Sequence, residues 1–185
     1  IRHTAVIPIA GDQITNDIAM ALRTPTAEAE GIKLDYGVAM QHLVDPSEAI
    51  DVPSVGDRPS RRLSRESLAA VIQPRVQELF ELVQGELRRS GYEELLSSGL
   101  VLSGGTAQLV SICELGDEVF HVPVRVGVPA YQGSLADVVC QPQYANVMGL
   151  VLEGAAQRRR GLQARDTRSF RHSFERLKAW LEKNF

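Results

Sequence analysis

The sequence is short of cysteine, of aromatic residues and of any large excess of one charge. Its two cysteines, Cys113 and Cys140, have apolar neighbours and neither a CxxC pattern nor a histidine at metal-ligand spacing. This favours reduced, buried thiols over a disulfide or a metal site, and it predicts a cytosolic chain. The formal net charge is −3 over 185 residues, so no overall positive field favours nucleic acid as a partner.

Long hydrophobic runs are also missing. No run approaches the length that spans a bilayer, and the N-terminal residues lack the pattern of a signal peptide. The sequence begins at Ile1, and residues 1–9 already have the pattern of a strand, so we interpret it as the C-terminal part of a longer protein. Its length allows one full core or two small subdomains, but not a two-lobed ATPase.

A pair of glycines, Gly104 and Gly105, is the clearest signal of a binding site. The pair follows the apolar run Leu100–Leu102, which predicts a buried strand, and precedes Thr106 and a predicted helix toward Cys113. Because glycine has no Cβ, a ligand can approach the backbone here, and the helix start offers free N–H groups to an anion or a polar ring. A tight turn without a ligand is the competing interpretation.

A second pattern of strand, turn and helix opens the sequence. A turn at Gly11 leads into a helix whose apolar residues recur at helical spacing: Ile14, Ile18 and Leu22. The next predicted helix starts with Thr26 as its N-cap and places Glu30 and Lys33 on one face. The pair is either a solvated ion pair or a carboxylate and an ammonium that face a cleft and hydrogen-bond a ribose and a base.

The middle of the sequence combines short strands with the strongest helical pattern. Two or three antiparallel strands are predicted between Tyr36 and Leu63, and four arginines lie close together: Arg58, Arg61, Arg62 and Arg65. These arginines fit either a solvated face or a docking site for an acidic peptide. Ser64 or Ser67 caps a long helix that ends at Ser90-Gly91; Pro74 interrupts it, and its polar face carries Arg75 with Glu78 and Glu81.

Beyond the glycine pair, three shorter elements and a distinct tail are predicted. We expect a helix over 109–119, a strand over 121–128 and a final core helix over 144–152 that follows Pro142. Residues 156–169 are polar and basic, which indicates a linker. Residues 170–185 predict an amphipathic helix with an apolar face: Phe170, Phe174, Leu177, Trp180, Leu181 and Phe185. It suits a membrane surface, docking on its own domain, or the groove of a partner.

Together these segments resemble the C-terminal half of the FtsA family of bacterial cell-division proteins, within the actin superfamily. The resemblance covers nearly the whole chain and rests on a combination of motifs: Arg2-His3-Thr4 leading to Gly11, Ala29-Glu30 with Ile32-Lys33, Val52–Gly56, Arg58-Pro59, Pro74-Arg75, Val101–Thr106, Phe120-His121, Val124–Pro129, Gly149-Leu150, and Trp180-Leu181 with Phe185. It implies an α/β, actin-like (ribonuclease H-like) second domain with a mixed sheet. The implied ranges are 1–25 and 96–155 for the core subdomain, 26–95 for an inserted small α+β subdomain, and the linker and amphipathic helix above.

The resemblance also implies roles for individual residues. Gly104, Gly105 and Thr106 are expected along the adenosine side of an ATP cleft, Glu30 and Lys33 at its ribose and base, and Gly11 near the phosphates. Arg75, and second Arg61, are the expected contacts of the acidic C-terminal peptide of FtsZ. The terminal helix matches the membrane-targeting sequence of the family. No catalytic residue and no metal ligand are assigned.

The resemblance implies a protein that binds ATP with Mg²⁺, assembles into an actin-like filament and tethers FtsZ to the cytoplasmic face of the bacterial inner membrane at the division septum. Further division proteins are possible partners. Because the phosphate loops of the family precede Ile1, we expect this chain alone neither to bind ATP tightly nor to hydrolyse it. The alternative is a lobe of a soluble ATPase of the same superfamily, of sugar kinase or chaperone type; an interaction module with an inactive cleft is a third option.

Overall fold

The computed structural model describes residues 1–56 and 59–160, in two compact parts that divide between Asn146 and Val147. The predicted membrane-binding residues therefore lie outside the described residues: Phe170, Phe174, Leu177, Trp180, Leu181 and Phe185. Arg58 and residues 161–169 of the predicted linker lie outside them as well.

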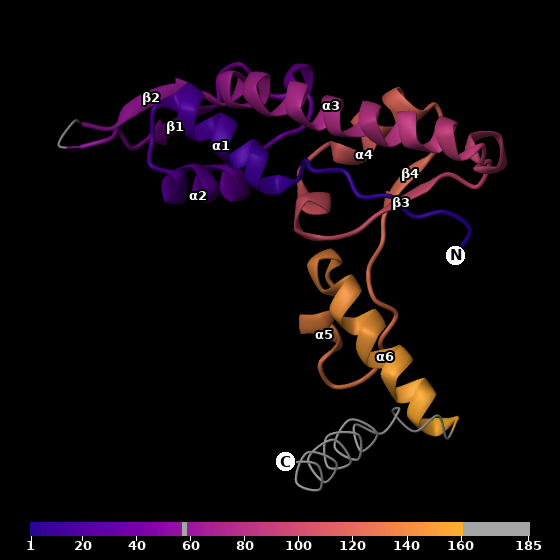
Figure 1. Cartoon of the computed structure of the whole chain (residues 1–185). Coiled ribbons are helices and arrows are strands. Elements are labelled where there is room, and N and C mark those ends of the chain that lie inside the picture. Colours follow the sequence, from indigo (N-terminus) through magenta and orange to yellow (C-terminus); the bar gives the residue numbers. More distant parts are fainter. Residues whose placement is uncertain (57–58, 161–185) are drawn as a thin grey trace, which may run out of the picture. The chain divides into compact units, whose positions relative to one another are not determined.

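Three helices form most of the first part. Helix α1 (Gly11–Leu22) packs against α2 (Thr26–Tyr36) and against the long helix α3 (Arg65–Ser90). Figure 1 shows α3 running past α1 near its start and past α4 (Ile112–Phe120) further along. All three predicted helices are confirmed, because their apolar stripes meet in one core: α1 buries Ile14, Ile18 and Leu22, and α3 buries Leu68, Ile72, Val76 and Phe80.

The ends of these helices follow local rules. The hydroxyl of Ser64 accepts a hydrogen bond from the backbone N–H of Ser67 at 3.2 Å, so Ser64 is the N-cap of α3. The helix continues through Pro74 and ends at Ser90, and the next residue, Gly91, has a φ of 73° that suits glycine. The prediction for Thr26 was wrong, since α2 begins at Thr26 itself, after Pro25, and no side chain caps it.

Four short strands form two separate pairs within the described residues. Strand β1 (Ala49–Val52) is antiparallel to β2 (Arg61–Ser64), as predicted, while β3 (Leu100–Leu102) is parallel to β4 (Val124–Val126). Five further elements of the described residues are short: η1 (Gln41–Leu43), η2 (Glu93–Leu95), η3 (Gly105–Gln108), α5 (Ala136–Val139) and η4 (Pro142–Tyr144).

Several predicted elements differ from the observed ones in extent or in burial. Residues 1–9 are not a strand, since a strand needs a hydrogen-bonded neighbour and none pairs with them in the part of the chain that the structure describes. Strand β3 is only half-buried, with Val101 exposed. The helix expected after the glycine pair is split into η3 and α4, because Ser111 adopts a left-handed conformation with a φ of 61°. The strand expected over 121–128 is shortened to β4.

The last described helix, α6 (Ala145–Arg159), also differs from its prediction. It was expected in the core, yet none of its residues is buried, and Val147, Leu150 and Val151 are exposed. It continues through residues 156–159, which the composition had placed in the linker. None of the helices within the described ranges is both long and apolar enough to cross a membrane.

Candidate functional site

The start of α1 meets α2 at a compact polar junction. The ammonium of Lys33 donates to the Glu30 carboxylate at 2.6 Å, to the Thr15 hydroxyl at 2.8 Å and to the Gly11 carbonyl at 3.2 Å. These three acceptors match the three protons of an ammonium. The Lys33 side chain is 11% exposed and that of Glu30 is 42% exposed, so the cation lies inside the junction and the carboxylate lies at its surface.

The electrostatics of the junction favour an ionised Glu30. Burial raises the pKa of Glu30, but hydrogen bonds from Lys33 and Thr15 and the charge of Lys33 outweigh it and hold the pKa below the ordinary value of 4.5. The bonds from both residues reach the Oε2 oxygen. Among the described residues none donates to Oε1, which leaves this oxygen as an acceptor for a ligand.

Thr106 brings the glycine pair to the same junction. A Cβ built on Gly11 would lie 2.7 Å from the Thr106 Oγ1 atom and 3.5 Å from the Lys33 Nζ atom. Gly104 has a φ of 98°, a backbone conformation that glycine tolerates, and its N–H donates to the Pro142 carbonyl at 2.9 Å. A Cβ on Gly104 or on Gly105 would meet nothing within 4 Å, so the space over the pair is open.

The predicted cofactor residues therefore share one place in the fold. Gly11, Glu30, Lys33 and Thr106 meet at the junction, with Gly104 and Gly105 on the adjoining turn. Sequence reasoning missed Thr15, which is 4% exposed and links Gly11 to Glu30. The available signal was its place beside Ile14 on the buried stripe of α1, where a hydroxyl needs a hydrogen-bond partner.

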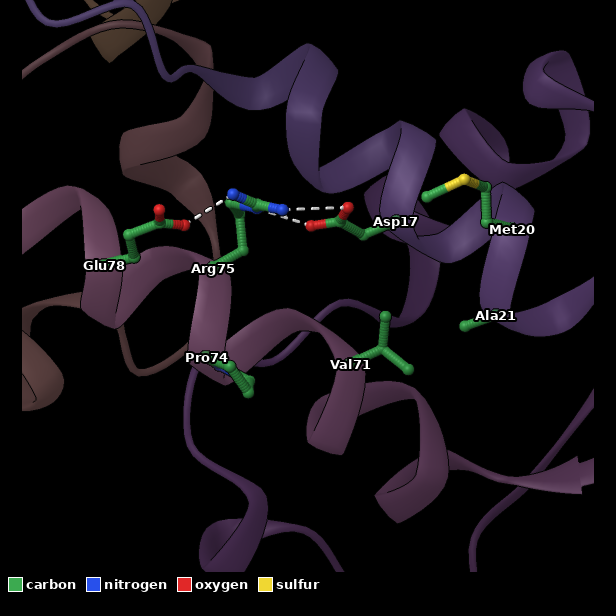
Figure 2. Close-up of a pocket in the computed structure, with 7 residues that line it drawn as sticks. All are labelled: Asp17, Met20, Ala21, Val71, Pro74, Arg75 and Glu78. Carbon is green, nitrogen blue, oxygen red and sulfur yellow. Dashed lines mark hydrogen bonds and ion pairs between the residues drawn. The ribbon is translucent and has the colours of Figure 1, made fainter.

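The predicted partner residue Arg75 lies at a second place, between α1 and α3. Its guanidinium forms a bidentate pair with Asp17, at 2.5 Å from Nε and 3.1 Å from Nη2, and its Nη1 atom contacts Glu78 at 2.5 Å (Figure 2). The hydrogen bond to Asp17 is the main cause that raises the pKa of Arg75. Glu81, which the sequence also placed near Arg75, instead accepts a hydrogen bond from Gln77 at 2.9 Å.

Arg75 lines a cavity of about 510 Å³. Figure 2 shows its other lining side chains, from α1 and from α3: Asp17, Met20, Ala21, Val71, Pro74 and Glu78. The cavity therefore combines an apolar lining with one guanidinium and two carboxylates. Pro74 also has no N–H to offer to the carbonyl one turn earlier in α3.

Arg61 lies at a different cavity. Its guanidinium donates to the Leu22 carbonyl at the end of α1, and it lines a space of about 340 Å³ together with Arg23, Ser54 and Val55. Arg65, from the same sequence cluster, pairs with Glu48 at 2.6 Å. The predicted basic patch is thus divided, and Arg61 and Arg75 line separate cavities.

Solved structures with a similar arrangement define the class of fold. MreB5 of Spiroplasma citri bound to ADP matches with a TM-score of 0.62 and 16% identity over 85% of this chain and 48% of that chain. MreB5 bound to AMPPNP matches with a TM-score of 0.56 and 17% identity over 82% of this chain and 47% of that chain. The chain therefore has an actin-like fold.

The sequence comparisons identify the family within that class. The family model described as "Cell division protein FtsA" matches residues 1–149. The cell division protein FtsA of Pseudomonas aeruginosa is 53% identical, and those of Neisseria meningitidis and Escherichia coli K12 are 41% and 40% identical; each match covers 100% of this chain and 46% of the relative. The chain belongs to the FtsA family of cell division proteins and spans about half the length of these relatives. This result favours the cell-division interpretation over a lobe of a soluble kinase or chaperone.

Proposed function

We propose that the full-length protein is a nucleotide-binding, filament-forming adaptor that attaches FtsZ to the cytoplasmic face of the inner membrane at the division septum. The observation that carries this proposal is the junction where Gly11, Glu30, Lys33 and Thr106 meet beside an open glycine turn. Many weak contacts along one filament add up to a firm attachment of FtsZ to the membrane, so no covalent bond is needed.

The junction fits one side of an adenosine nucleotide site. The Oε1 atom of Glu30, to which no described residue donates, suits a ribose hydroxyl, and the open backbone at Gly104 and Gly105 suits a flat base or a nearby phosphate. The proposed contacts of the ribose and base are Glu30 and Lys33, and the contacts of the Lys33 ammonium with Glu30, Thr15 and Gly11 hold both side chains in place. The related fold of MreB5 was solved with ADP and with AMPPNP, which supports a nucleotide here.

A nucleotide in such a site carries a metal ion with its phosphates. Within residues 1–56 and 59–160, no group of three or more His, Cys, Asp and Glu side chains is arranged to hold one. We propose that Mg²⁺ accompanies the nucleotide in the full-length protein, and we assign no residue of this chain to it.

The cavity at Arg75 fits a peptide that carries both acidic and apolar residues. Its lining includes Met20, Val71 and Pro74, which suit an apolar side chain, and Arg75 suits a carboxylate. The acidic C-terminal peptide of FtsZ is the proposed occupant. Arg61, which lines a separate cavity, is a proposed second contact. Residues 170–185 are the proposed membrane anchor, because their sequence combines an apolar aromatic face with flanking cations.

Sedimentation with vesicles tests the adaptor function as a whole. The full-length protein, FtsZ from the same organism and anionic phospholipid vesicles are mixed with ATP and centrifuged. We expect FtsZ to sediment with the vesicles only when the adaptor is present. A variant that ends after Arg160 keeps α6 complete, and we expect it to leave FtsZ in the supernatant.

Two further variants separate the steps. Arg75→Gln should remain on the vesicles while FtsZ is lost from the pellet, and Arg62→Gln, a charge-matched change on β2 away from the Arg75 cavity, should behave as the unmodified protein. Retention of FtsZ by the variant that ends after Arg160 would overturn the membrane role of the tail. Retention by Arg75→Gln would overturn the docking site.

A further inference from the structure

The cluster around Arg75 holds one cation between two carboxylates. Asp17 and Glu78 both contact its guanidinium, so one positive and two negative charges give a sum of −1. An acidic group that approaches this cluster meets net repulsion as long as both carboxylates stay in place. An acidic ligand therefore binds the Arg75 guanidinium only when Asp17 or Glu78 gives up its contact.

The two carboxylates are held differently. Asp17 makes a bidentate contact from α1, and its side chain is 19% exposed. Glu78 makes one contact from the next turn of α3, and its side chain is 49% exposed. Bidentate charge-assisted pairs are strong and directional, whereas exposed pairs three residues apart on a helix contribute little. Glu78 is thus the easier partner to displace.

The hydrogen bond between Arg75 and Glu78 lies at the cavity that a ligand would enter. Glu78 and Arg75 line the same space as the apolar side chains of Met20 and Val71 (Figure 2). A peptide whose apolar residue fills this space would hold a neighbouring carboxylate close to Arg75. Its carboxylate and that of Glu78 would then compete for the Nη1 donor.

We propose that Glu78 is an internal competitor of the acidic partner: the partner's carboxylate replaces Glu78 on the Nη1 atom of Arg75, while Asp17 keeps the guanidinium in position. The inference rests on the proposed function, since it requires the acidic peptide to bind at Arg75. Glu78 then sets the affinity of the site, and Asp17 acts as a positioning residue.

Peptide binding to charge-neutral variants tests the exchange. A fluorescent peptide with the C-terminal sequence of FtsZ from the same organism is titrated with the full-length protein, and anisotropy gives Kd. Glu78→Gln should bind about two- to fivefold more tightly, the range that corresponds to loss of one exposed ion pair. Glu81→Gln is the matched control, because it makes the same change in charge on the same helix without touching Arg75.

The outcomes separate the inference from the function on which it rests. Tighter binding by Glu78→Gln with no change in Glu81→Gln supports the competition, and weaker binding by Asp17→Asn, shown by its melting curve to be folded, supports the positioning role. The inference would be overturned if Glu78→Gln and Glu81→Gln changed Kd equally, or if neither changed it. Weaker binding by Arg75→Gln in the same experiment would show that the docking site itself still stands. If Arg75→Gln also bound normally, the proposed docking site itself would fail.

Discussion

A Cβ on Gly11 would lie 2.7 Å from the Oγ1 atom of Thr106, although the two residues are far apart in the sequence. The close approach joins the start of α1 to the glycine turn, and Lys33 and Glu30 attach α2 to the same point. The spacing leaves room for a hydrogen at Gly11 but not for a methyl group.

Gly11→Ala should therefore destabilise the chain by about 1–2 kcal/mol, because the new methyl group overpacks against Thr106. Chemical denaturation measures the change. The control is Gly31→Ala, where the methyl group meets nothing within 4 Å in the middle of α2, and a gain of about 0.5–1 kcal/mol is expected. The double variant Gly11→Ala/Thr106→Ser keeps an Oγ atom at position 106 and therefore keeps the clash. Gly11→Ala/Thr106→Ala lacks this atom and should relieve it. Equal stability of the two double variants would contradict the contact.

Gly105→Ala should separate binding from folding. A Cβ at this position meets nothing within 4 Å, and the residue does not have a positive φ, so the free energy of unfolding should change by less than about 0.5 kcal/mol. If a nucleotide lies against this backbone, the methyl group occupies its place. Calorimetric titration of the full-length variant with ATP should then show at least about tenfold weaker binding. Unchanged affinity would remove the glycine turn from the site.

Lys33→Met should raise the pKa of Glu30. In the unmodified protein the hydrogen bonds from Lys33 and Thr15 lower this pKa against the opposing effect of burial. Without the Lys33 ammonium, the effect of burial, which raises the pKa of Glu30, is larger than that of the remaining hydrogen bond from Thr15. A titration of the Glu30 carboxyl carbon by NMR measures the shift. Asp45 is the internal control, because its pKa is lowered by hydrogen bonds from the backbone and hydroxyl of Ser47, which the substitution does not touch.

The same linkage predicts how the stability of the junction depends on pH. Because the folded-state pKa of Glu30 lies below the unfolded value of 4.5, its contribution is present above that pH and is lost as the pH falls through the folded-state pKa. The difference in unfolding free energy between the unmodified chain and Lys33→Met should be largest near pH 7 and smaller below pH 4.5. A difference that grew on acidification would have the wrong sign.

Leu150→Glu should leave the stability of this chain almost unchanged, because Leu150 is 76% exposed on α6. We expect a change within about 0.5 kcal/mol. Ile72→Ala on α3, where the side chain is 0% exposed, should cost about 2–5 kcal/mol by comparison. Thermal and urea denaturation of both variants provide the test. A large loss of stability in Leu150→Glu would contradict the exposure of this side chain.

Local patterns predicted what depends on neighbours in the sequence. The apolar spacing of Ile14, Ile18 and Leu22 defines α1, and Ser64 and Gly91 define the ends of α3. The pairing of Glu30 with Lys33 was also predictable, since residues three apart share a helix face. These features require no knowledge of what lies across the core.

Contacts between distant elements could not be predicted in the same way. Nothing near Arg75 in the sequence indicates that Asp17 on another helix is its bidentate partner. From the sequence alone Thr15 is an ordinary helix residue, because the Glu30 carboxylate to which its hydroxyl donates lies on another helix, α2. The failed strand over residues 1–9 has the same cause, because alternation reports a preference for extended backbone and not the presence of a neighbour.

Hydrogen exchange of the unmodified full-length protein, with and without ATP, tests the nucleotide site most directly. We predict that ATP slows exchange of the backbone amides around Gly11, around Glu30 and Lys33, and at Gly104–Thr106, because the nucleotide covers all three segments at once. Amides in strand β2, which lies outside the three segments, serve as the internal reference and should not change. Unaltered exchange in all three segments at saturating ATP, with protection only elsewhere in the protein, would contradict the proposed site.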